Sequence, residues 1–145
     1  MRLLFVLLLL LPGIKVPAEQ YNAGLARQNY ILNCQGCHLS DGSGSRGGAP
    51  RMNGFTGNFL HVPGGREYIV QVPGVASAAI SDADLAGVIN WVLVNFSKEQ
   101  LPDNFQPYTA AEVGSLRRSA LINVEQVRSQ LIKQIEQVLG VREEP

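Results

Sequence analysis

Apolar residues recur at three- and four-residue steps near the middle of the chain, which is the spacing of one face of a helix. Within residues 82–96 these positions are Leu85, Val88, Ile89, Val92 and Phe96. Ser81 stands where the N-cap of such a helix is expected, and Asp82 and Asp84 place negative charge in its first turn. The pattern therefore predicts a helix from Asp82 to about Phe96.

The same spacing marks the C-terminal part of the chain, which we interpret as a linker and a helical extension over residues 98–145. The apolar positions are Val124, Val127, Leu131, Ile135 and Val138. Asn123 is expected to cap this helix and Gly140 to end it, while the capping box from Thr109 to Glu112 starts an earlier helix near residue 110. The apolar stripe packs back on the rest of the protein or, alternatively, docks a partner protein or a second copy.

Two further helices complete an all-α prediction. Residues 19–33 have few helix breakers and are expected to form a helix, and residues 66–71 form one or two turns. Residues 40–50 contain four glycines and are predicted to form a loop.

The first residues have the layout of a secretory signal peptide. Arg2 is followed by nine apolar residues, then by Pro12 and Gly13, and then by small residues near Ala18. A membrane anchor would need about twenty apolar residues. We therefore expect residues 1–18 to be removed on export, to the bacterial periplasm, with no transmembrane anchor left. The chain has 46% hydrophobic and 17% charged residues and zero net charge, so nothing indicates binding to nucleic acid.

Both cysteines of the chain lie in one short motif, Cys34-Gln35-Gly36-Cys37-His38. A disulfide across so short a loop would add little stability. A thioredoxin-like thiol pair leaves the histidine without a role, and structural zinc would need a second ligand pair. The interpretation that uses all three residues is C-x-x-C-H, the attachment motif of haem c.

The spacing suits this chemistry. Each thiol of Cys34 and Cys37 forms a thioether with one vinyl group of a single haem, and His38 follows at once as the proximal iron ligand. The neighbouring glycine-rich loop is then expected to wrap closely around a flat cofactor.

Residues 19–97 resemble the class I cytochromes c in the order of helix, C-x-x-C-H, glycine-rich loop, "GGAPRMNG", short helix and final helix. The resemblance implies that the first and last helices cross, with Ala26 and Tyr30 meeting Trp91 or Phe96. It also implies that the carbonyl of Pro50, twelve residues after His38, accepts a hydrogen bond from that ring.

The sixth iron ligand is where the chain departs from the family pattern. The family usually supplies a Met just before the last helix, but Gln71 to Ser81 contain no Met, His, Cys or Lys. His61 is the leading candidate because it is the only other imidazole of the chain. Met52 is the alternative, although the family packs an apolar residue there on the His38 side. An open or water-bound iron is the third possibility.

The predicted function is electron transfer by one covalent haem c, as an exported carrier or redox subunit. Its partners would be redox proteins such as a dehydrogenase or an oxidase. No catalytic residue is predicted, because His61 cannot both bind iron and act as a base. The alternative is an open-iron haem protein with peroxidase-like or gas-binding activity.

Overall fold

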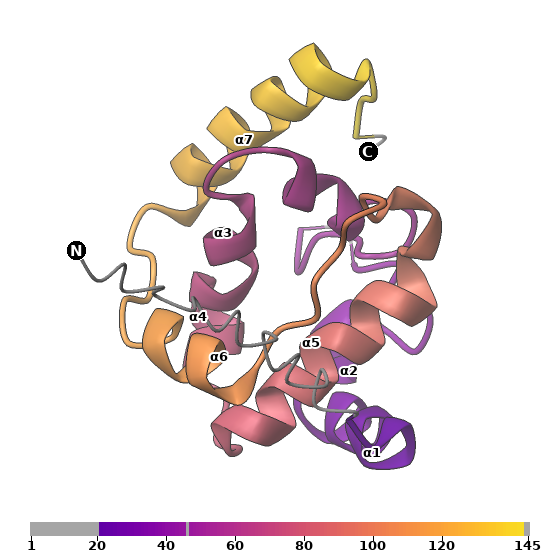
Figure 1. Ribbon diagram of the computed structural model, residues 1–145, viewed down its shortest axis with the longest axis vertical. Coiled ribbons are helices and arrows are strands. Elements are labelled where there is room, and N and C mark those ends of the chain that lie inside the picture. The colour runs from indigo at the N-terminus through magenta and orange to yellow at the C-terminus, as the bar shows by residue number, and fades with distance from the viewer. Residues whose placement is uncertain (1–20, 46, 144–145) are drawn as a thin grey trace, which may run out of the picture.

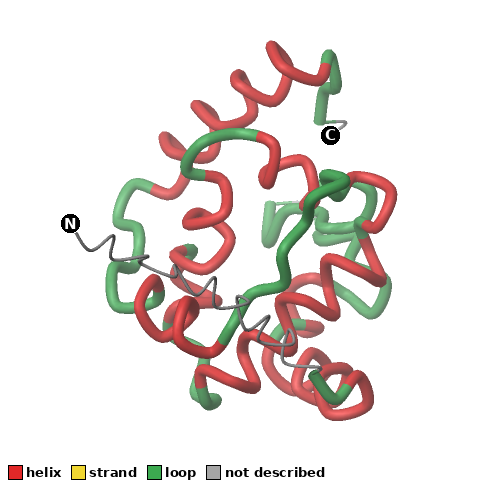
Figure 2. Tube along the Cα trace, viewed as in Figure 1, coloured by secondary structure: helices red, strands yellow, loops and turns green. Residues whose placement is uncertain are grey.

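The computed structural model describes residues 21–45 and 47–143, and within them every regular element is a helix (Figure 1). Figure 2 shows the same chain as helices joined by loops, with no strand in this described part, which confirms the all-α prediction. The α-helices are α1 (Ala23–Asn33), α2 (Gln35–His38), α3 (Gly65–Gln71), α4 (Pro73–Ala76), α5 (Asp82–Phe96), α6 (Ala110–Leu116) and α7 (Val124–Leu139). Two 3₁₀ helices, η1 (Thr56–His61) and η2 (Lys98–Gln100), complete the set.

Helices α1 and α5 pack against each other, as the resemblance implied. Ala26 and Tyr30 are the buried residues of α1, and the ring centroids of Tyr30 and Trp91 lie 5.3 Å apart. Phe96 also contacts Tyr30, with its ring edge-on at 5.3 Å. Small and aromatic side chains therefore let the two helices approach closely, and they place the end of α1 beside α5.

Helix caps explain where most of these elements begin. The Ser81 hydroxyl accepts a hydrogen bond from the Asp84 N–H at 3.1 Å, so the predicted start of α5 is confirmed. Helix α1 begins at Ala23 rather than at residue 19, because the Asn22 side chain caps it. Asn123 occupies the N-cap position of α7, as predicted, but its side chain makes no cap hydrogen bond.

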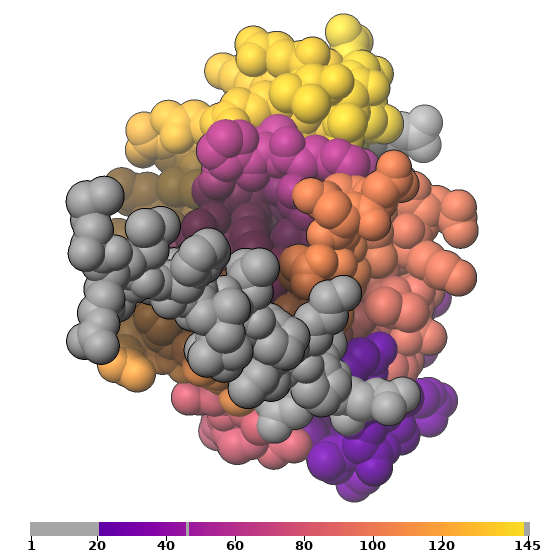
Figure 3. Space-filling view, viewed as in Figure 1, coloured from indigo at the N-terminus to yellow at the C-terminus, as the bar shows by residue number. Residues whose placement is uncertain are grey.

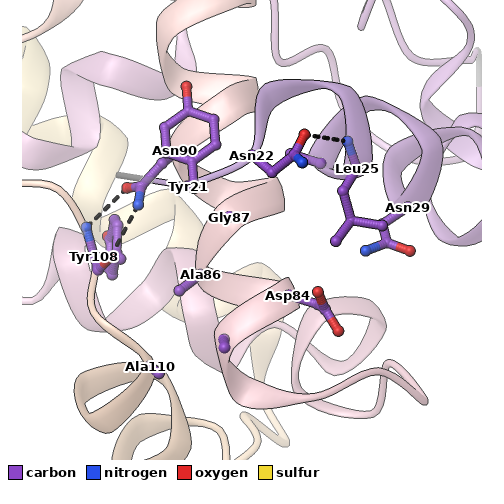
Figure 4. A pocket seen from close by; sticks show the side chains of 12 residues that line it. Tyr21, Asn22, Leu25, Asn29, Asp84, Ala86, Gly87, Asn90, Tyr108 and Ala110 are labelled. Carbon is purple, nitrogen blue, oxygen red and sulfur yellow. Dashed lines mark hydrogen bonds between the residues drawn. The ribbon is translucent and has the colours of Figure 1, made fainter. Parts of the chain in front are cut away.

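Hydrogen bonds attach the segment between α5 and α6 to the neighbouring helices. The buried Asn90 side chain pairs with the backbone of Tyr108, accepting from its N–H at 2.8 Å and donating to its carbonyl at 2.9 Å (Figure 4). The Arg66 guanidinium lies 4.0 Å from the centre of the Tyr108 ring and also bonds Glu112 of α6. These contacts join the C-terminal part of the chain to α3 and α5.

Helix α7 packs back on the rest of the protein. It lies across η1 and α3 at one end of the molecule, and the space-filling view shows it covering that end (Figures 1 and 3). Leu131 and Ile135 of the predicted stripe are buried, whereas Val138 at its end is 63% exposed. Gly140 ends the helix in the left-handed conformation, at φ 67°, as expected. Among the described residues, no helix has the length and apolarity to cross a membrane. The predicted signal peptide lies outside these residues.

Replacing Ile135 with Ala tests how much α7 contributes to the fold. Ile135 is fully buried in the main hydrophobic cluster, so its removal should lower the free energy of unfolding by about 2–5 kcal/mol. Chemical denaturation of the two proteins measures the difference. The matched change Val138→Ala, on an exposed position of the same helix, should alter stability by less than about 0.5 kcal/mol. Equal effects of the two changes would show that α7 is only loosely attached.

Candidate functional site

The C-x-x-C-H motif forms one short helix directly after α1. The Cys37 N–H and the His38 N–H both donate to the Cys34 carbonyl, at 3.2 and 3.0 Å. This single turn brings three side chains that are close in sequence to the same side of the backbone. All three line one cavity, so the structure brings the predicted haem-binding residues together.

The cavity lies at the centre of the helices and has a volume of about 570 Å³. Its lining comes from α1, α2, the loop that follows α2, η1, α3, α4, the segment before α5, α5 and the start of α7. Most of the side chains are aliphatic or aromatic, with His38 and a few other polar groups among them. A large apolar pocket with few polar groups is typical of a cofactor site.

His38 is oriented by the loop that follows it. Its Nδ1 lies 3.0 Å from the Pro50 carbonyl oxygen, to which it therefore donates, as the resemblance implied. This hydrogen bond fixes the tautomer and leaves Nε2 with a free lone pair for a metal. Burial lowers the pKa of His38, against a smaller raising effect of the Pro50 carbonyl, so the neutral imidazole that iron requires is favoured.

The glycine-rich loop is compact because a side chain at either of two of its glycines would clash with neighbouring atoms. Gly42 and Gly44 both adopt φ 73°, a conformation that favours glycine. A Cβ at Gly42 would lie 2.8 Å from the Phe96 ring, and one at Gly44 would lie 2.5 Å from the Ala49 carbonyl oxygen. The loop therefore closes tightly against α5 and returns Pro50 to His38.

The cysteines are not arranged for thiol redox chemistry. Burial, and secondarily the neighbouring Cys37, raises the pKa of the Cys34 thiol to about 11. A reactive redox cysteine has a lowered pKa, because the thiolate is the nucleophile. The thiol oxidoreductase interpretation is therefore disfavoured, and attachment to a cofactor accounts for both residues and for His38.

One buried polar group in the cavity wall also fits a haem. Arg128 of α7 lines the cavity, and its Nε is buried without a hydrogen-bond partner among the described residues. The other guanidinium nitrogens bond Glu143. Tyr68 of α3 lines the same cavity. A haem carries two propionate groups on the edge away from its vinyl groups, and a carboxylate would satisfy this Nε. The residues present therefore fit the group.

The two candidate sixth ligands differ in where the structure places them. Met52 lines the cavity and packs against the cluster of Tyr30, Val88 and Val92, where α1 crosses α5. The structure does not bring His61 to the cavity, because it lies outside the lining and its Nε2 donates to the Gln100 carbonyl at 3.0 Å. The expectation that His61 ligates the iron therefore finds no support in this geometry, since that ring nitrogen already has a partner.

Sequence reasoning missed three residues that shape the site. Arg128 and Tyr68 line the cavity from helices far apart in the chain, and Arg117 fixes the segment before α5. Arg128 interrupts the apolar pattern of α7, between Val127 and Leu131, and this interruption is the only local signal. Nothing in the pattern around Arg117 indicates its role.

No family model matches the chain. Two curated relatives do, both named cytochrome c-552 and both from Thermus thermophilus, the second from a designated strain of that species. Each is 31% identical over 106 residues, which cover 61% of this chain. The match spans 81% of the first relative and 72% of the second. With this similarity, the helical fold and the motif at one cavity, the chain belongs to the class I c-type cytochromes.

Proposed function

We propose that the chain carries electrons between redox proteins outside the cytoplasm, through one haem c bound at Cys34, Cys37 and His38. As a member of its family the protein binds haem c covalently and transfers electrons. The observation that carries the assignment of residues is that all three side chains of the motif line a single apolar cavity of about 570 Å³.

Each residue of the site has a separate task in this function. The two cysteines hold the haem by thioether bonds, and His38 binds the iron through Nε2 while Pro50 keeps the ring in place. The bound haem supplies an iron that alternates between the ferric and ferrous states. The mostly apolar lining of the cavity excludes water, which favours a defined reduction potential.

The surface next to the motif offers a contact for a redox partner. Cys37 is exposed, Leu32 is 71% exposed and Leu39 is 43% exposed. The two leucines are adjacent in sequence to Asn33 and His38, which line the cavity, so both lie near the motif. A partner that docks there would approach the haem closely enough for electron transfer. The donor and the acceptor would be proteins such as a dehydrogenase and an oxidase.

The proposed export is tested by fractionating cells that make the full chain. The expected result is mature protein in the periplasmic fraction, starting after about residue 18, with haem attached. Protein of full length in the cytoplasm would contradict the proposal. The N-terminal sequence of the purified protein supplies the same information independently.

Replacing His38 with Ala tests the proximal ligand. The haem should stay attached through both thioethers, but the iron should lose its normal coordination, because the imidazole that the cavity lining supplies is removed. The measurement is the visible spectrum in both oxidation states. Imidazole added to the solution should partly restore the original spectrum, which a misfolded variant would not show. An unchanged spectrum of His38→Ala would refute the assignment.

A further inference from the structure

Arg117, at the end of α6, holds the segment that joins α4 to α5. Its guanidinium donates to three carbonyl oxygens, those of Ala76, Ala78 and Ile80, two of them at 3.0 Å. It also pairs with Asp82 of α5 at 3.1 Å. The segment is thus fixed along its length by one side chain that is 16% exposed. Charge-assisted hydrogen bonds therefore attach this segment to the end of α6.

Five of the side chains that line the cavity consist only of hydrocarbon. They come from α3 and from the chain between α3 and α5. Val75, Ala78 and Ile80 line the cavity, together with Ile69 of α3 and Val72. We refer to these five residues as the apolar wall. None of these side chains carries a nitrogen, oxygen or sulfur atom that could bind iron. Ile69, Val72, Val75 and Ala78 belong to the main hydrophobic cluster, whereas Cys34 packs against the separate cluster of Tyr30, Val88 and Val92, so these four residues and the motif line different parts of the cavity. Ile80 contacts both clusters.

Three other residues of the lining that carry a sulfur or oxygen atom are poor candidates for a sixth ligand. Met52 packs against the same cluster of Tyr30, Val88 and Val92 as Cys34, and its N–H donates to the Gly42 carbonyl at 2.6 Å, so it lies with the motif rather than with most of the apolar wall. Burial raises the pKa of Tyr68, which keeps the phenol in the protonated form that binds iron weakly. The hydroxyl of Tyr30 already donates to the Leu39 carbonyl at 2.6 Å.

We infer that this protein leaves the sixth position of its haem iron free for a small neutral diatomic molecule, of the class of carbon monoxide, nitric oxide and dioxygen. The inference rests on the proposed haem site. Hydrocarbon side chains of the apolar wall offer such a ligand space without hydrogen bonds, which suits an uncharged molecule better than an anion. Carbon monoxide, the simplest member of the class, would donate a lone pair to ferrous iron, with no electron gained or lost. The carrier therefore gains a second state in which reduction of the iron permits ligand binding.

The test uses carbon monoxide and the purified holoprotein. The pyridine haemochrome spectrum first establishes that haem c is attached, and failure at this stage would overturn the proposed function itself. The dithionite-reduced protein is then titrated with carbon monoxide. The expected result is a high-spin ferrous spectrum that changes on addition of one equivalent. A low-spin ferrous spectrum that carbon monoxide leaves unchanged overturns the inference while the haem c assignment stands. In that case, Met52→Leu and His61→Ala identify which residue fills the position.

Variants of the apolar wall test its placement. Val75→Met and Ala78→Met each add a thioether where the family supplies its ligand. At least one should become low-spin and bind carbon monoxide at least about tenfold more weakly, because only the fraction of iron left free can bind. Val94→Met is the matched control, since Val94 is 39% exposed on α5 and lies outside the cavity lining. Unchanged binding in both wall variants would show that the wall does not face the sixth position.

Discussion

Replacing both Cys34 and Cys37 with Ala should abolish covalent haem attachment and, with it, electron transfer. These residues are the only cysteines of the chain, so no other thioether can form. Mass spectrometry should show the mass of the bare polypeptide, and acid extraction should remove any haem that remains bound through His38 alone. The double variant should also be less stable, because the apolar cavity of about 570 Å³ would lose the ligand that fills it.

The matched control for this experiment is Gln35→Ala, which changes the motif without changing its pattern. Gln35 lies between the two cysteines in α2, and its carbonyl, not its side chain, accepts the hydrogen bond from Leu39. The control should keep its covalent haem in full. Haem that survives acid extraction in the double cysteine variant would show that the protein attaches its cofactor elsewhere.

The parts of the fold that depend on local pattern could be predicted from the sequence. The start of α5 follows from Ser81, the end of α7 from Gly140, and the crossing of α1 and α5 from Ala26 and Tyr30. These features depend on contacts within a few residues or on one family pattern. The C-x-x-C-H motif is local as well, since its three side chains lie within five residues.

The rest of the site depends on contacts between distant segments. Arg117 bonds carbonyls about forty residues earlier in the chain, and Arg128 reaches the cavity only because α7 packs across η1. Similarly, the carbonyl that accepts the hydrogen bond from His61 Nε2 belongs to Gln100, 39 residues away. Because the partner in each case is a backbone group or a cavity, no pattern of residue types indicates it. The sequence could show that His61 was available, but not that it was already bonded.

Tyr30 connects the helix crossing to the haem-binding motif. Its ring is 1% exposed between Trp91 and Phe96, and its hydroxyl bonds the residue directly after His38. That residue, Leu39, has φ 61° and ψ 173°, a backbone conformation that costs about 1–3 kcal/mol for any residue except glycine. The hydrogen bond from Tyr30 helps to hold the strained residue, and so sets the direction in which the chain leaves His38.

Tyr30→Ala should therefore lower the free energy of unfolding of the holoprotein by about 3–5 kcal/mol, since a buried aromatic ring is replaced by a cavity. Trp91→Ala should cost less, because the indole is only partly buried. Tyr30→Phe keeps the ring and removes the hydroxyl, so it should cost about 1 kcal/mol through the unpaired Leu39 carbonyl. Denaturant unfolding followed by circular dichroism measures all three, with haem content checked in each sample. If Tyr30→Ala and Tyr30→Phe cost the same, the hydroxyl rather than the ring carries the contribution, and the packing of α1 on α5 is weaker than its contacts indicate.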